Sequence, residues 1–326
     1  MRTIYTKARG RQVRIVFPEG NQPKIMQAAR ILREEGICEP VLLGKPSVIR
    51  ELMEAQQLDE LKDLTIIDPA ESDRLPDYME SYYRMRQRHG LSLREARLAA
   101  RRRNVFASLM LHHGEVDGMV TGLTMSYPEA VRPPLEIVRT RNGRRAGGVY
   151  LLVFKNEFKF LADCTVNVDP TSEELAEIAI NTADLAAHFD VTPRVALLSY
   201  ANFGSAEGPS PRKVRKALEL IRKARPELQV DGEMQVDAAL VPEIREQNFP
   251  FSALEEPANV LIFPNLDSAN IGYKLLWRLG NAEVIGPVLL NMNRPVNVLQ
   301  LGSSVKDIVN LAAVTALRAQ GDQFAY

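Results

Sequence analysis

Residues 161–180, LADCTVNVDPTSEELAEIAI, decide the fold of this chain. Leu161-Ala162 ends an apolar run that predicts a buried strand, and Asp163-Cys164 follows directly. After a turn, Thr171 and Glu174 have the spacing of a capping box, which predicts the start of a helix. An acid and a thiol between a strand and a capped helix are typical of the ligand crevice of an α/β protein. An ordinary strand–loop–helix unit with a half-buried cysteine fits this stretch equally well.

The rest of the chain alternates predicted strands and helices around this unit. The predicted strands comprise residues 12–17, 40–44, 64–67, 116–120, 194–200, 229–231, 259–263 and 284–290, the last as a strand or a buried turn. Helices are predicted for residues 23–35, 47–55, 106–112, 267–279 and 305–319, for two segments within 76–103, and for segments that begin at Ser210-Pro211 and near Ala238. Residues 149–155 and 157–162 predict a hairpin. Most of the strands are apolar throughout, which favours a parallel sheet covered by helices on both faces.

Composition and charge describe an ordinary globular protein. The chain has 326 residues, enough for about two domains. Its 41 basic and 41 acidic residues balance, so net charge favours neither a nucleic-acid nor a membrane partner. No apolar run approaches the roughly 20 residues of a membrane-spanning helix. Two cysteines, Cys38 and Cys164, provide no disulfide framework and favour a cytoplasmic location.

The first eleven residues, MRTIYTKARGR, are basic and lack the apolar core of a signal peptide. We expect this segment to be the tail of a linker from a longer protein, with Met1 marking the point where this chain was started.

Two stretches are candidates for binding an anion. Residues 121–127 form a loop of mostly small residues between a predicted strand and a helix that holds Arg132, and such a loop can present backbone N–H groups to an anion. The run Arg101-Arg102-Arg103 is either a phosphate-binding cluster or a solvated helix face, and we favour the solvated face. The four histidines lack the spacing of a zinc site, and no Walker loop, nucleophile elbow or dinucleotide fingerprint is present.

Several stretches, in this order and spacing, resemble the phosphate acetyltransferases (phosphotransacetylases), and the resemblance covers nearly the whole chain. They are VRIVFPEG (13–20), the Gly122 loop and the following helix as far as Arg132-Pro133, LADCTVNVDPTSEELAEIA (161–179), VALLSY (195–200), VDGEMQVDAALVPEI (230–244), FPNLDSANIGYKL (263–275) and GSSVKDIVNLAA (302–313).

This resemblance implies an α/β protein of two three-layer domains with a cleft between them, similar to the isocitrate and isopropylmalate dehydrogenases. We expect residues 1–147 and 300–326 to form the first domain, because the C-terminal helix returns to it, and residues 148–299 to form the second. The family also implies a homodimer that pairs through the second domain.

The family's reaction moves an acetyl group between acetyl phosphate and coenzyme A. It needs a carboxylate to take the thiol proton and arginines to hold the acetyl phosphate as charge develops. By motif position the carboxylate is Asp307, the arginines are Arg132 and, by a looser alignment, Arg86, and Cys164 is the cysteine near the substrate. No metal and no tightly bound cofactor is expected.

The residues expected to contact acetyl-coenzyme A or phosphate are Arg132, Phe203, Gly204, Ser205, Asn265, Asn270, Gln300, Leu301, Gly302, Ser303 and Asp307. Gly204 and Ser205 are the best candidates for donating backbone N–H groups to an anion.

Three positions depart from the pattern of the active enzymes. Their Ser-Arg pair before the final glycine is replaced by Gln300-Leu301, their His-Thr-Thr by Met125-Ser126-Tyr127, and a loop lysine by Phe203. An arginine aimed at an acyl or phosphoryl transition state contributes about 3–4 kcal/mol, so these losses argue against efficient acetyl transfer.

The departures are similar to the C-terminal domain of hybrid NADP-dependent malic enzymes. Our leading hypothesis is therefore a regulatory domain with a degenerate acetyltransferase site, which binds acetyl-coenzyme A as an allosteric effector. Its partners would be an N-terminal malic enzyme domain and further copies, as a dimer or a larger assembly. The alternative is an active phosphate acetyltransferase. A third reading is another dehydrogenase-like or acyltransferase-like enzyme on this scaffold, including one with butyryl specificity.

Overall fold

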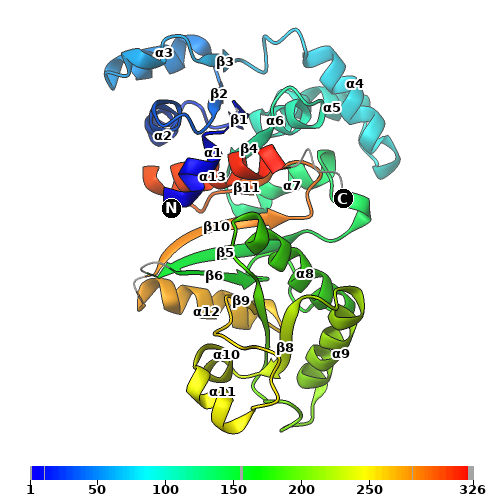
Figure 1. Ribbon diagram of the computed structural model, residues 1–326. Helices are drawn as coiled ribbons and strands as arrows, with labels where there is room; N and C mark the ends of the chain where they lie inside the picture. Colours follow the sequence, from blue (N-terminus) through cyan, green and yellow to red (C-terminus); the bar gives the residue numbers. More distant parts are fainter. Residues whose placement is uncertain (1, 11, 155–156, 281, 322–326) are drawn as a thin grey trace. The chain divides into compact units, whose positions relative to one another are not determined.

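The computed structural model describes residues 2–10, 12–154, 157–280 and 282–321, and these form two compact α/β units (Figure 1). Unit 1 comprises Met1–Arg144 and Met292–Tyr326, and unit 2 comprises Arg145–Asn291. The predicted α/β fold is confirmed. The second boundary falls earlier in the chain than the expected 299/300, because strand β11 (Val296–Val298) pairs with a strand of unit 1.

The sheet of unit 1 is parallel throughout, as predicted. Its strands lie in the order β3-β2-β1-β4-β11. Their bounds are β1 Arg14–Phe17, β2 Glu39–Leu43, β3 Thr65–Ile67, β4 Gly118–Thr121 and β11 Val296–Val298. In a parallel sheet the carboxyl ends of all strands lie at one edge, so the loops after β1, β4 and β11 are neighbours there.

The first helix, α1 (Arg2–Ala8), corrects the expectation of a linker tail. Ile4 and Ala8 are buried, and α1 packs against the last helix, α13 (Val305–Gly321). The Tyr5 hydroxyl donates to Asn310 Oδ1 of α13 at 2.5 Å. The segment is therefore an integral helix of unit 1.

The remaining helices of unit 1 include the basic segment. They are α2 Pro23–Glu34, α3 Pro46–Ala55, α4 Leu75–Arg86, α5 Leu93–Ala100, α6 Arg103–His112 and α7 Tyr127–Ile137, with short 3₁₀ turns at Asp59–Leu61, Gln87–His89 and Arg141–Gly143. Helix α5 ends at Ala100 and α6 begins at Arg103, so the arginine run 101–103 lies at the break between the two helices. Helices α6 and α7 pack against each other, α6 against β4 and α7 against β11.

Unit 2 has a mixed sheet in the order β10-β5-β6-β9-β7-β8. Its strands are β5 Gly147–Phe154, β6 Glu157–Ala162, β7 Arg194–Leu198, β8 Gln229–Met234, β9 Val260–Ile262 and β10 Glu283–Leu290. The predicted hairpin is confirmed as the antiparallel pair β5–β6, with residues 155–156 of its turn outside the described residues. Strand β10 is antiparallel to β5, whereas β6, β9, β7 and β8 are mutually parallel.

Four helices of unit 2 begin within two residues of the predicted starts, and a fifth, from Pro242, was not predicted as a separate helix. They are α8 Ser172–His188, α9 Pro209–Ala224, α10 Val236–Leu240, α11 Pro242–Asn248 and α12 Leu266–Arg278. The capping box of α8 is formed, with Glu174 N donating to Thr171 Oγ1 at 3.2 Å and Thr171 N to Glu174 Oε2 at 2.9 Å. Helix α9 starts at Pro209 rather than at Ser210-Pro211.

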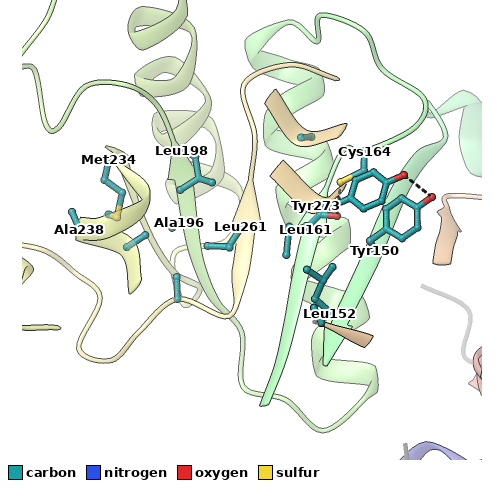
Figure 2. Packing of buried hydrophobic residues seen from close by; sticks show 14 of the residues in the cluster. Tyr150, Leu152, Leu161, Cys164, Ala196, Leu198, Met234, Ala238, Leu261 and Tyr273 are labelled. Atoms are coloured by element: carbon teal, nitrogen blue, oxygen red, sulfur yellow. Dashed lines mark hydrogen bonds between the residues drawn. The ribbon is translucent and has the colours of Figure 1, made fainter. Parts of the chain in front are cut away.

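One hydrophobic core of unit 2 joins its sheet to α10 and α12 (Figure 2). Tyr150 of β5 stacks on Tyr273 of α12 with ring centroids 4.1 Å apart, and Cys164 is fully buried beside them. Across both units, each described helix is too short or too polar to cross a membrane.

Candidate functional site

A buried carboxylate holds the loop that precedes the Arg132 helix. Glu19, after β1, accepts hydrogen bonds from Gly122 N at 2.9 Å and from Thr124 N at 2.7 Å. Gly122 has φ +97°, and a Cβ there would lie 2.7 Å from a Val298 side-chain atom, so only glycine fits. These contacts fix the path of the chain from β4 into α7.

Asn104 of α6 compensates for two prolines inside α7. Pro133 and Pro134 have no N–H, so the carbonyl groups four residues earlier lose their helical donors. The Asn104 amide donates to both, to Glu129 O at 3.3 Å and to Ala130 O at 3.0 Å. Since Arg132 lies between these carbonyls and the prolines, Asn104 stabilises the turn of helix that carries it.

A cavity of about 430 Å³ in unit 1, here called the arginine cavity, contains both arginines that the sequence singled out. It is lined by Tyr82, Arg86, His89, Gly90, Leu91, Glu95, Leu98, Ala99, Arg102, Val105, Arg132, Pro133 and Glu136. Arg86 comes from the end of α4, Arg132 from the middle of α7, and Arg102 from the break between α5 and α6. Three arginines from three segments therefore line one concave surface, and arginine is well suited to binding a phosphate group.

The charges of the arginine cavity are only partly neutralised. Glu136 pairs with Arg86 at 3.4 Å and accepts from the Tyr82 hydroxyl at 3.2 Å. Burial raises the pKa of Tyr82, and the Glu136 carboxylate adds to the effect. Within the described part of the chain, neither Arg102 nor Arg132 has an acidic partner within 4 Å. Two cations thus remain available to an anionic ligand.

Asp307 forms the capping box at the start of α13. Its Oδ2 accepts from Ser304 N and from Ser304 Oγ, both at 2.8 Å, and Asp307 N donates to Ser304 Oγ at 3.2 Å. Its other carboxylate oxygen, Oδ1, has no hydrogen-bond partner among the described residues. The cap fixes the side chain while one oxygen is left to accept a proton.

The segment before this cap carries the remaining predicted residues of unit 1. The Gln300 carbonyl accepts from Ser303 N at 3.1 Å and from Ser303 Oγ at 2.8 Å, and Gly302 turns the chain with φ +83°. Leu301 is 66% exposed. Lys24 Nζ donates to the Ser303 carbonyl at 2.9 Å, which brings one cation to this loop.

In unit 2, Asp163 and Cys164 lie at the carboxyl end of β6. Asp163 is buried and accepts from the backbone N–H groups of Gly148, Thr165, Val166 and Asn167, and from the Asn167 amide. Burial raises the pKa of Asp163, and these hydrogen bonds oppose the shift. Burial also raises the pKa of the Cys164 thiol well above its usual range, with the Asp163 charge adding to it. A protonated, buried thiol is not a nucleophile. Asn270 Nδ2 contacts the Cys164 carbonyl at 3.4 Å, so these two predicted residues do come together.

The loop after β7 uses its N–H groups internally, contrary to the expectation for Gly204 and Ser205. Gly204 N donates to Glu233 Oε1 at 2.9 Å, and Ser205 N donates to Asn202 O at 2.9 Å. The physical reason is that Glu233 is completely buried and needs donors for its carboxylate. Phe203 has φ +47° and packs on Phe249 and Phe251, each ring centroid 5.0 Å away.

Asn265 caps α12, its Oδ1 accepting from Ser268 N at 3.0 Å. It follows β9, so it lies at the same sheet edge as Cys164 and the Phe203 loop.

Three residues of unit 1 that shape the candidate site were not predicted from the sequence: Arg102, Glu19 and Asn104. Arg102 stood in the arginine run assigned to a solvated face, and Glu19 stood in a matched motif. Among the described residues, no group of three or more His, Cys, Asp and Glu side chains is arranged to hold a metal ion.

Comparison with known proteins gives a consistent family. A family model described as phosphate acetyl/butaryl transferase matches residues 1–316. The phosphate acetyltransferase of Bacillus subtilis is 38% identical over 97% of this chain and 98% of its own length. The crystal structure of a phosphotransacetylase from Streptococcus pyogenes superimposes with a TM-score of 0.93, at 40% identity, covering 98% of this chain and 99% of that one.

These matches contradict the leading hypothesis of a malic enzyme regulatory domain. The NADP-dependent malic enzyme of Escherichia coli is also 38% identical over 98% of this chain, but the match covers 43% of that protein. The phosphate acetyltransferases of Bacillus subtilis and Thermoanaerobacterium thermosaccharolyticum match over 98% and 99% of their own lengths, which supports the alternative reading. With the family model spanning nearly the whole chain, the chain belongs to the phosphate acetyl/butaryl transferase family.

Proposed function

We propose that this protein is a phosphate acetyltransferase, which interconverts acetyl phosphate plus coenzyme A and acetyl-coenzyme A plus phosphate. The observation that carries the proposal is the match with curated phosphate acetyltransferases at 38–39% identity over 97–98% of this chain and 98–99% of theirs. The arginine cavity supports it, because acetyl phosphate, phosphate and coenzyme A are all anions that guanidinium groups bind.

In the proposed reaction the coenzyme A sulfur attacks the acetyl carbonyl carbon. A C–S bond forms, the bond between that carbon and the phosphate oxygen breaks, and phosphate leaves with its electron pair. Asp307 Oδ1 is the proposed acceptor of the thiol proton, since Oδ2 is occupied by the helix cap. In this scheme Cys164 is a packing residue, because a protonated thiol cannot attack.

Arg132 and Arg102 are the proposed anion-binding groups. Neither forms an ion pair in the described structure, so both charges can act on a ligand, although Glu95 and Glu136 line the same cavity. Removing one preorganised donor from such a site lowers kcat by about 10²- to 10³-fold. Arg86 shares its charge with Glu136, so its loss should have a smaller effect.

The test is formation of acetyl-coenzyme A from acetyl phosphate and coenzyme A, followed by thioester absorbance. The wild-type protein should turn over at roughly 1–1,000 per second. Arg132→Ala should lower kcat/KM by about 10²-fold or more. Arg84→Ala is the control, because this arginine on α4 is 72% exposed, pairs with Glu80 and lies outside the cavity lining. Absence of turnover in folded wild-type protein would refute the proposed function. Butyryl phosphate in the same assay measures acyl preference.

We also propose a homodimer that pairs through unit 2. Helix α12 exposes Ile271 and Leu275, at 59% and 52%, and its C-cap residue Leu279 is 79% exposed; their spacing of four residues places them on one face. Leu275→Glu should therefore yield monomers in analytical ultracentrifugation, and an unchanged mass would contradict the interface.

Both cysteines are free, in keeping with the cytoplasmic location that we propose.

A further inference from the structure

A second basic cavity, here called the Arg139 cavity, lies in unit 1 and has no role in the proposed reaction. Its volume is about 450 Å³, and it is lined by Met85, His112, Ile137, Val138, Arg139, Asn293 and Arg294. The basic groups come from three places: the last residue of α6, the residue after the α7 cap, and the loop before β11. The Arg139 cavity shares no lining residue with the arginine cavity, and a third hollow of about 570 Å³ adjoins both, because it shares Arg86, His89 and Glu136 with one and Arg139 and Asn293 with the other.

Positive charge accumulates in this cavity without a counterion. None of its lining residues is acidic, and neither Arg139 nor Arg294 forms an ion pair within the described residues. Burial lowers the pKa of His112, and the neighbouring His113, Arg139 and Arg294 lower it further. The positive charges of both guanidinium groups therefore disfavour protonation of the His112 imidazole.

The backbone of Arg139 is held in a conformation that favours glycine. Its φ is +62°, and its N–H donates to Pro134 O at 3.1 Å, which closes the C-terminal turn of α7. Glycine is the usual residue at such a position because a Cβ is strained there. Asn293 fixes the turn, its N donating to Arg139 O at 3.0 Å and its Nδ2 to Val138 O at 2.9 Å. Arg139 Nη2 donates to the Met85 carbonyl at 3.5 Å, so the side chain that this strained backbone carries is directed toward another residue of the cavity lining.

We propose that the Arg139 cavity binds a small oxyanion, the phosphate or carboxylate group of a metabolite, at a site separate from the arginine cavity. Two guanidinium forks and an imidazole supply the donors, and the locked turn preorganises one of them. A phosphate ester and a free phosphate offer the same chemistry, so inorganic phosphate is the appropriate first probe.

Histidine NMR tests the proposal without needing turnover. The chain has 4 histidines, and His112→Gln assigns the signal of interest. Inorganic phosphate is titrated into the Arg132→Ala protein, at ionic strength held constant with KCl, so that the arginine cavity is weakened. A saturable shift at His112, absent at His188, is expected, and bound phosphate should raise the pKa of His112 because it offsets the charges of Arg139 and Arg294.

Two variants separate binding from a structural role. Arg139→Gly relieves the positive φ, so the protein should be at least as stable as before while phosphate binding weakens about tenfold or more. Arg294→Ala should weaken binding similarly. Equal, non-saturating shifts at all four histidines would overturn the proposal. So would a loss of stability in Arg139→Gly with phosphate affinity unchanged, since the arginine would then only stabilise helix ends.

Discussion

The link between Asn104 and the two prolines of α7 provides a test of how Arg132 is positioned. Asn104→Ala removes the donor that serves Ala130 O, which is buried, and Glu129 O, which is partly buried. It also removes the acceptor of the Thr121 hydroxyl at 3.2 Å. Leaving a buried polar group unpaired costs about 1–3 kcal/mol. The total loss of unfolding free energy should therefore be about 2–4 kcal/mol, most of it from the Ala130 carbonyl.

Replacing both prolines should remove much of this cost. In the Pro133→Ala, Pro134→Ala background, the new N–H groups can donate to the carbonyls of Glu129 and Ala130 in the normal helical pattern. Asn104→Ala then loses only the contact with Thr121 and some packing, about 1 kcal/mol. The double-mutant cycle should give a coupling energy of about 1–3 kcal/mol.

The measurement must report on unit 1. The single tryptophan, Trp277, lies in unit 2, so hydrogen exchange of peptides covering α7 is the better reporter. Ser108→Ala is a matched control, because Ser108 is buried one turn along α6 and donates to Asn104 O rather than to α7. Coupling below about 0.5 kcal/mol would refute the reasoning. The assay for acetyl transfer should show kcat falling in Asn104→Ala and recovering in the proline background.

Three further predictions concern single residues. Glu19→Gln places an amide donor against the N–H of Gly122 or Thr124 and should lower the unfolding free energy by about 2–3 kcal/mol in urea titrations, whereas unchanged stability would contradict the network. Cys164→Ala should retain most of the acetyl-transfer rate, and the folded wild type should resist iodoacetamide at about pH 8, so alkylation of this thiol would speak against its burial. The Arg33 guanidinium lowers the pKa of Asp63 to about 2. A lowered carboxyl pKa contributes stability that is present above the ordinary value of 3.8 and is lost as pH falls through about 2. The unfolding free energy of Asp63→Asn should therefore fall less than that of the wild type over this pH range in urea titrations, and NMR titration of the wild-type Asp63 carboxyl checks the lowered pKa.

Local signals made most of the fold predictable. The box formed by Thr171 and Glu174 carries the information for the start of α8 within four residues, and the structure forms it as expected. The start of α9 is harder, because Pro209 and Pro211 both lie where the first N–H groups of a helix have no helical acceptor. Sequence alone therefore does not choose between the two prolines.

Long-range contacts were beyond the sequence. The α1 segment is short and basic, and its burial depends on α13, whose Asn310 lies 305 residues from its partner Tyr5. No sequence pattern identified Asn104 as the residue that donates to the α7 carbonyls. The two prolines of α7 implied that some donor must reach their orphaned carbonyls, but only the packing of α6 on α7 identifies which one. Arg102 was missed because the two-residue break between α5 and α6 interrupts a sequence with good helical propensity.

A count of motif cations is a poor measure of the electrostatic field in a site. Charge stabilisation depends on how near a cation lies to the developing anion and on what else neutralises it. Arg102 and Arg132 have no acidic partner in the described structure, so the arginine cavity keeps its charge although Leu301 occupies a family arginine position.

Leu301→Arg tests this reasoning directly. Leu301 is 66% exposed, so an arginine there would be largely screened by solvent. The gain in kcat/KM should therefore stay below about tenfold, equivalent to about 1.4 kcal/mol. Leu301→Gln serves as the control for loss of the apolar side chain without added charge. A gain of about a hundredfold or more in Leu301→Arg alone would show that the family arginine, and not the arginine cavity, supplies the charge on which acetyl transfer depends.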